Sequence, residues 1–170
     1  MFTNFYTYIF FYILIISCSM GYGLAINSIS KKFKITDNLG YVGLIGVLFL
    51  IIYAYLSSIF IHHGQFHNSI ILIIGLLFFV KFYFFNSKKK KEQWTYFFII
   101  FLILLMGAFF LKTHDDFPYY HFSYSHYLTE NSLIFGMGHF NLGYRTPSSI
   151  FYLNSLFYLP FVKYFMFHMP

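Results

Sequence analysis

The residues best suited to chemistry gather in one polar segment, residues 112–148, of an otherwise apolar chain. This segment holds three of the five acidic residues, the only arginine and four of the eight histidines. Asp115 and Asp116 are adjacent near its start, just ahead of Pro118. A carboxylate in this place can act as a general base, or it can cap a short helix whose first turn contains the proline. The two roles can coexist, and the sequence leaves both open.

Arg145 is the second candidate for chemistry. A guanidinium group binds phosphate through two parallel hydrogen bonds, which suits it to this task better than the ammonium group of a lysine. An arginine can equally anchor a loop at the membrane interface. The sequence favours neither role over the other.

The histidines and the glycine-rich stretch carry weaker signals. His62, His63 and His67 lie in a turn without a neighbouring acid, which favours an interfacial role over a metal site. His121 and His126 are five residues apart, so they fit poorly on one helical face. Gly136-Met137-Gly138 lacks the third glycine of a dinucleotide-binding motif and indicates a turn. We therefore predict no metal site built from these histidines.

An all-helical membrane architecture must position these residues. The chain is 59% hydrophobic and only 9% charged, whereas a soluble domain carries about 25% charged residues, and its mean hydropathy is +0.65. A helix needs about 20 apolar residues to cross the hydrocarbon layer, and on that basis about five transmembrane helices are expected. They cover residues 5–26, 39–61, 68–85, 93–111 and 149–166. The first four fill residues 1–111, and the fifth, within 149–170, is weaker because Pro160 and Lys163 interrupt it.

The loop between the fourth and fifth helices, residues 112–148, has a helical pattern of its own. From Asp116 to Glu130 the sequence suits an amphipathic helix that lies in the membrane interface. Its apolar and aromatic residues fall broadly on one side, and tyrosine suits the headgroup layer. These residues are Phe117, Tyr120, Tyr124, Tyr127 and Leu128.

The lysines predict the orientation of the chain. Lys31, Lys32, Lys34 and the run Lys88–Lys91 lie in loops two helices apart, which share one side of the membrane. Because basic loops stay in the cytoplasm, the N-terminus and residues 112–148 are expected outside and the C-terminus inside. The net charge of +6 therefore reflects topology, and a nucleic-acid partner is not expected. The single cysteine, Cys18, excludes a disulfide framework or a cysteine-based zinc site within one chain.

Three short stretches carry a resemblance to a known group of proteins. Asp116-Phe117-Pro118-Tyr119-Tyr120-His121 resembles the D-x-x-x-Y-H stretch that opens the first large outer loop in a group of bacterial polytopic membrane proteins. Gly136-Met137-Gly138-His139-Phe140-Asn141 and Arg145-Thr146-Pro147-Ser148-Ser149 are similar to the same group's G-L-G-N-L-H stretch and its following R and N-S-S run. His139 replaces an asparagine of that pattern. The group resembles the GT-C superfamily of membrane glycosyltransferases, and the similarity covers roughly residues 115–151.

The resemblance implies a fold and an activity. GT-C enzymes take a sugar from a polyprenyl-phosphate carrier and pass it to an acceptor on the outer side of the bacterial plasma membrane. It implies that Asp116, with Asp115 beside it, is the catalytic base, and it leaves open a divalent cation held by both. It further implies a substrate-binding role for Arg145, Lys112, Tyr120 and His121. Because GT-C enzymes usually have seven or more spans, these 170 residues are expected to form the N-terminal part of such a fold.

Two other classes of function compete with this expectation. The chain could be a non-catalytic assembly or scaffold protein, in which the outer segment is only an interfacial helix. A transporter or channel is disfavoured because charged residues are almost absent from the predicted spans, whereas transport paths usually contain intramembrane polar groups. Sugar transfer that depends on Asp116 distinguishes the enzyme from the scaffold.

Overall fold

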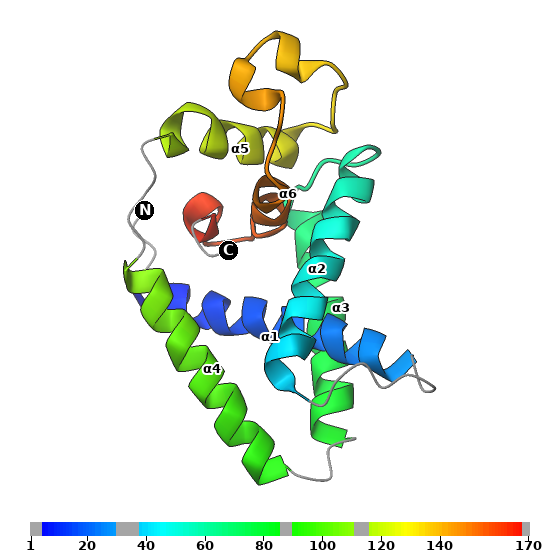
Figure 1. Ribbon diagram of the computed structural model, residues 1–170, viewed down its shortest axis with the longest axis vertical. Coiled ribbons are helices and arrows are strands. Elements are labelled where there is room, and N and C mark those ends of the chain that lie inside the picture. Colours follow the sequence, from blue (N-terminus) through cyan, green and yellow to red (C-terminus); the bar gives the residue numbers. More distant parts are fainter. Residues whose placement is uncertain (1–4, 30–37, 86–89, 111–115, 168–170) are drawn as a thin grey trace. The chain divides into compact units, whose positions relative to one another are not determined.

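The computed structural model describes residues 5–29, 38–85, 90–110 and 116–167, and these residues form helices joined by turns (Figure 1). The α-helices are α1 (Phe5–Ile29), α2 (Leu39–Ser58), α3 (Gln65–Phe79), α4 (Lys90–Phe110), α5 (Phe122–Glu130) and α6 (Ser149–Leu156). Two π-helical segments, η1 (Val80–Phe85) and η2 (Phe117–His121), extend α3 and precede α5. Short 3₁₀ turns are η3 (Met137–His139), η4 (Leu142–Tyr144) and η5 (Tyr164–Met166). The all-helical fold class is confirmed for this part of the chain.

Three helices within the described residues are long and apolar enough to cross a membrane. They are Phe5–Ile29, Leu39–Ser58 and Gln65–Tyr83, with mean hydropathies of 2.0, 2.2 and 1.8. They agree with the first three predicted spans. In α4 the apolar stretch Thr95–Gly107 is shorter. The chain is thus a helical protein built to be embedded in a membrane.

The chain forms two compact units, which we describe separately. The span unit contains residues 9–29, 38–50, 70–85 and 90–110, and the site unit contains residues 5–8, 51–69 and 116–167. In the span unit, glycines let helix backbones approach closely. A methyl group at Gly21 would collide with the carbonyl of Gly75, and one at Gly46 would collide with the carbonyl of Ser19. Small residues at helix contacts are typical of packing in lipid, where no hydrophobic driving force joins the helices.

The fifth predicted helix, residues 149–166, is corrected by the structure. The helix α6 covers only Ser149–Leu156, a length of about 12 Å at 1.5 Å per residue, so it does not cross a layer of about 30 Å. Pro160 explains the early end, because proline lacks the backbone N–H and disfavours helix at the residue before it. After it the chain turns sharply: Phe161 and Lys163 have φ angles of 70° and 47°.

The amphipathic helix predicted over residues 116–130 is present as η2 followed by α5. Of its predicted apolar side, Tyr124 and Leu128 are almost fully buried, at 2% and 0% exposure. Helix α5 packs against α6 within the site unit (Figure 1). The helix was thus predicted correctly. Its buried residues, Tyr124 and Leu128, pack against other parts of the protein.

Candidate functional site

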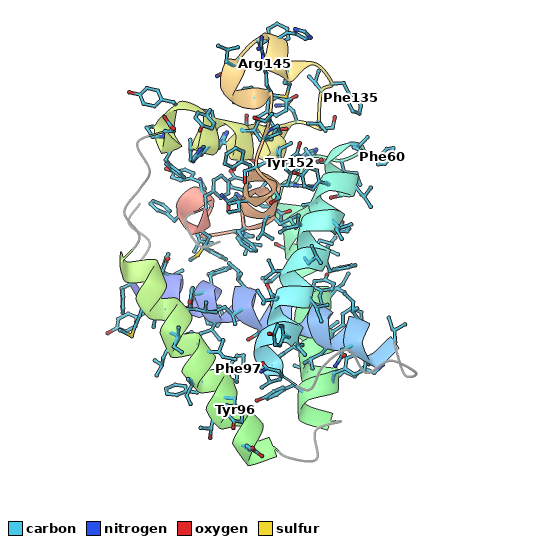
Figure 2. The ribbon with its side chains drawn as sticks, in the orientation of Figure 1. Phe60, Tyr96, Phe97, Phe135, Arg145 and Tyr152 are labelled. Carbon is cyan, nitrogen blue, oxygen red and sulfur yellow. The ribbon has the colours of Figure 1, made fainter. Side chains whose placement is uncertain are left out.

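A pocket of about 410 Å³ opens in the site unit beside the loop that follows α5. Its wall is formed by Leu133, Ile134, Phe135, Gly136, Met137, Gly138, His139, Tyr124, Tyr144 and Arg145. Figure 2 shows Phe135 and Arg145 on the loop segment between α5 and α6. The pocket thus combines aromatic walls, a tight glycine turn and one permanent positive charge. This composition suits a small ligand that carries both a ring and a negative charge.

Asp116 stands at the start of η2, but its side chain does not cap the helix. It occupies the N-cap position, with proline in the first turn, and makes no capping hydrogen bond from its side chain. Instead its Oδ2 accepts a hydrogen bond from the hydroxyl of Tyr120 at 3.3 Å. Partial desolvation and the adjacent carboxylate raise the pKa of Tyr120. Asp116 thus occupies the predicted N-cap position without the predicted capping bond, and its carboxylate accepts from a hydroxyl group instead.

Tyr120 connects this carboxylate to the turn that carries Arg145. The ring of Tyr120 packs on Gly143 so tightly that a methyl group on the glycine would lie 2.7 Å from the ring Cγ. Gly143 is in η4, and Arg145 is the residue that ends this turn. Asn141 holds the turn by accepting a hydrogen bond from the N–H of Gly143 at 2.9 Å. Two residues that were candidates by sequence, Asp116 and Arg145, are therefore joined through Tyr120 and one glycine.

Arg145 is exposed at the pocket, and one bond orients it. Its Nε donates to the carbonyl of Gly138 at 3.3 Å, which uses one of the five N–H donors of a guanidinium. A methyl group on Gly138 would lie 2.9 Å from Cγ of Arg145, so only glycine lets the side chain lie across this turn. Gly136 has a φ of 92°, which confirms the predicted turn and explains its glycine.

The remaining predicted residues divide into two groups. His121 is half-buried, with its ring 4.7 Å from that of Phe151 and 4.4 Å from that of Tyr120, so it packs beside Tyr120. Lys112 and Asp115 lie outside the described residues, as do Lys31, Lys32, Lys34, Lys88 and Lys89. Among the residues described, no group of three or more histidines, cysteines or acids could hold a metal ion. The candidate site therefore consists of Asp116, Tyr120 and Arg145.

The structure also contains a polar network that sequence reasoning missed. His63, predicted to be interfacial, is instead fully buried, at 0% exposure. Its Nδ1 lies 2.6 Å from Oγ of Ser155 in α6, and its Nε2 lies 2.8 Å from Oγ of Ser57 in α2. Burial and the neighbouring imidazoles of His67 and His62 lower the pKa of His63 to about 3. The ring is neutral at physiological pH and bridges two helices.

Asn68 completes this network from the first turn of α3. Its Nδ2 donates to the carbonyls of His63 (2.7 Å), Ser155 (2.8 Å) and Tyr158 (3.0 Å). Its Oδ1 lies 3.0 Å from Nδ1 of His67. An amide oxygen only accepts, so Nδ1 of His67 carries a proton, and Nε2 of His67 lies 2.8 Å from the hydroxyl of Tyr53.

Three tyrosines link this network to the pocket. Oγ of Ser155 donates to the carbonyl of Tyr152 at 2.7 Å. The ring of Tyr152 stacks on Tyr55 of α2 at 3.9 Å, and its hydroxyl lies 2.7 Å from that of Tyr124. Tyr124 is a buried residue of α5 and also forms part of the pocket wall. Figure 2 shows Tyr152 in α6, below the loop of Arg145.

Nothing in the local sequence pairs His63 with Ser155, because 92 positions separate them. A usable signal was the uncharged polar pair Ser57 and Asn68, which flanks the histidine-rich turn at the ends of two apolar helices. In lipid such groups need internal partners. That requirement predicts that these groups form hydrogen bonds within the protein, but it does not identify Ser155 as their partner.

Comparison with known proteins adds one positive finding. No curated protein and no solved structure matches the chain. A family profile described as Domain of unknown function (DUF8201) matches residues 6–169. This match covers nearly the whole chain of 170 residues, and the chain therefore belongs to the DUF8201 family.

Proposed function

We propose that this chain is a membrane glycosyltransferase of the GT-C type, or the N-terminal part of one. It transfers a sugar from a polyprenyl-phosphate carrier to an acceptor on the outer side of the bacterial plasma membrane. The observation that carries the proposal is the connection from Asp116 through Tyr120 to the turn of Arg145, beside a pocket of about 410 Å³. A base and a phosphate ligand are the two groups that such a transfer needs.

The carboxylate of Asp116 supplies the base. It already accepts a hydrogen bond from one hydroxyl, that of Tyr120, and an acceptor hydroxyl would approach it in the same manner. In the transfer the acceptor oxygen attacks the anomeric carbon and its proton passes to Asp116. The bond from that carbon to the carrier phosphate breaks, the phosphate leaves with the electron pair, and the sugar inverts its configuration.

Arg145 supplies the phosphate ligand. Its guanidinium is exposed at the pocket, and the donors that Gly138 leaves unused can pair with two phosphate oxygens. As the carbon–oxygen bond breaks, negative charge grows on the leaving phosphate, so a fixed positive charge there stabilises the transition state more than the ground state. The predicted orientation, with residues 112–148 outside, would put both groups on the side where lipid-linked sugars are used.

One observation favours a second candidate, the non-catalytic assembly protein. Phe135, Phe140 and Leu142 are 79%, 91% and 71% exposed on the loop that carries Arg145. Apolar groups exposed together often mark a surface that a partner covers. An assembly protein would need this surface, but it would not need a phosphate ligand.

Binding of the donor separates the two candidates. We expect Arg145→Gln to weaken binding of a synthetic polyprenyl-phosphate sugar about 10- to 100-fold, the usual worth of hydrogen bonds to a charged group. The measurement is equilibrium binding to purified protein in lipid nanodiscs. Arg145→Lys should weaken binding less than Arg145→Gln does, because lysine keeps the positive charge but lacks the two parallel N–H donors of the guanidinium. Lys163→Gln, which removes an exposed cation of the same unit outside the pocket, should bind normally; equal binding by all four proteins would favour the assembly function.

A further inference from the structure

His63 lies where the turn between α2 and α3 meets α5 and α6 in the site unit. It belongs to the turn between α2 and α3, and its backbone N–H donates to the carbonyl of Leu128 in α5 at 2.8 Å. Its side chain bonds to Ser155 in α6, and its own carbonyl accepts from Asn68. One residue thus joins the α2–α3 turn to both α5 and α6.

A neutral ring fits this position in two ways. If Nδ1 carries the proton, it donates to Ser155, whose hydroxyl donates to the carbonyl of Tyr152, and Ser57 donates to Nε2. If Nε2 carries the proton, it donates to Ser57, whose hydroxyl donates to the carbonyl of Tyr53, and Ser155 donates to Nδ1. In both arrangements a neutral His63 satisfies both of its nitrogens.

A protonated ring can keep these two hydrogen bonds, but within the described part of the chain no acidic side chain pairs with its charge. The titratable groups that face it are the imidazoles of His67, 5.2 Å away between ring centres, and of His62. From α5 it meets a backbone carbonyl, and from α6 a serine hydroxyl. On α5, Nε2 of His126 lies 3.9 Å from Oε1 of Glu130, whose side chain is 64% exposed. A buried charge without a counter-ion is costly, and water entering an opened network relieves that cost.

We propose that His63 is a pH-sensitive latch: in its neutral form it holds the α5–α6 layer on the α2–α3 turn, and acidification releases that layer and the pocket it carries. The release reaches the pocket because Ser155 bonds to Tyr152, and Tyr152 bonds to Tyr124 in the pocket wall. This inference does not depend on sugar transfer, since any function of the pocket would be gated in the same way.

The direction of the effect follows from the two states of His63. In the closed form its pKa is about 3, and in the open form it returns toward about 6.5. Between these values the open form binds more protons than the closed form. The α5–α6 layer is therefore held on the α2–α3 turn most firmly above about pH 6.5. This docking weakens as the pH falls toward 3. The docking equilibrium constant should fall about tenfold for each pH unit.

Hydrogen–deuterium exchange of the protein in nanodiscs tests the latch. Protection of peptides from residues 122–158, corrected for the intrinsic effect of pH on exchange, reports how often this layer opens. We expect protection to fall about 50-fold between pH 6.5 and 4.5, because the open form is already half-protonated at pH 6.5. His63→Gln should abolish this slope while leaving protection at pH 4.5 equal to that at pH 6.5. Protection that stays flat in the natural protein would overturn the proposal, as would an unchanged slope in His63→Gln.

A second variant keeps the test decisive if His63→Gln does not fold. The triple variant His62→Gln, His121→Gln and His126→Gln removes His62 and the two histidines of the η2–α5 segment, but it leaves His63 and the neighbouring His67 in place. It should keep the full slope of about tenfold per pH unit. Loss of the slope in this variant would assign the effect to those residues and refute the latch.

Discussion

Asp116→Asn is expected to lower the rate of sugar transfer by about 10² to 10⁴, the usual contribution of a general base. The side chain of Asp116 makes no capping bond that asparagine would lose, and the side-chain oxygen of an asparagine can still accept the hydrogen bond from Tyr120. The local structure should therefore survive, while the amide cannot take a proton from the acceptor. The loss should appear in the catalytic rate at saturating donor, measured with radiolabelled sugar.

Glu130→Gln is the matched control for this experiment. It removes an acid from the same helical segment, and its carboxylate is 64% exposed and paired loosely with His126 at 3.9 Å. It should leave the rate unchanged. Full activity of Asp116→Asn at normal expression would remove Asp116 from the chemistry and leave it as a helix-start residue.

The second large effect is expected for Asn68→Leu, and it concerns stability. Leucine has a similar volume, but it removes the donor that serves three carbonyls and the acceptor that serves His67. Asn68 is 1% exposed, so water cannot replace these partners in the closed unit. Because a buried polar group left without a partner costs about 1 to 3 kcal/mol, the site unit should lose roughly 3 to 5 kcal/mol.

Asn141→Ala provides the comparison. Asn141 is exposed, and its side chain accepts one hydrogen bond, from Gly143, so a loss of about 1 kcal/mol or less is expected. Both variants can be followed by reversible unfolding in mixed detergent micelles. A loss below about 1 kcal/mol for Asn68→Leu would show that the network is not what holds α3, α6 and the turn together.

Sequence patterns predicted the parts of the fold that local physics decides. Uninterrupted apolar runs gave the three membrane-length helices within a few residues, because burial in lipid demands about 20 such residues in a helix. The helix over residues 116–130 followed from its apolar periodicity and from Pro118. The same reasoning made the last helix too long. The residues after Pro160 are still apolar in composition, but they are not helical in continuation of α6. There the strained turn at Phe161 and Lys163 decides the path.

The candidate site was predictable only in part. Residue chemistry singled out Asp116 and Arg145, but their connection depends on the ring of Tyr120 packing on Gly143, a contact between residues 23 positions apart. The role of His63 was beyond reach, because its partners come from α2, α5 and α6. Its histidine-rich turn was predicted to be interfacial, and His63 is buried because α5 and α6 cover it.

Sugar transfer by the product of the complete reading frame, in membranes, tests the central claim most directly. A panel of radiolabelled polyprenyl-phosphate sugars would be incubated with membranes that contain the protein and with membranes that lack it. The proposal predicts that at least one donor loses its sugar to an envelope acceptor only when the protein is present, and that Asp116→Asn stops this transfer. If every donor keeps its sugar with the folded protein, the chain is not a glycosyltransferase for carriers of this kind, and the assembly function would replace it.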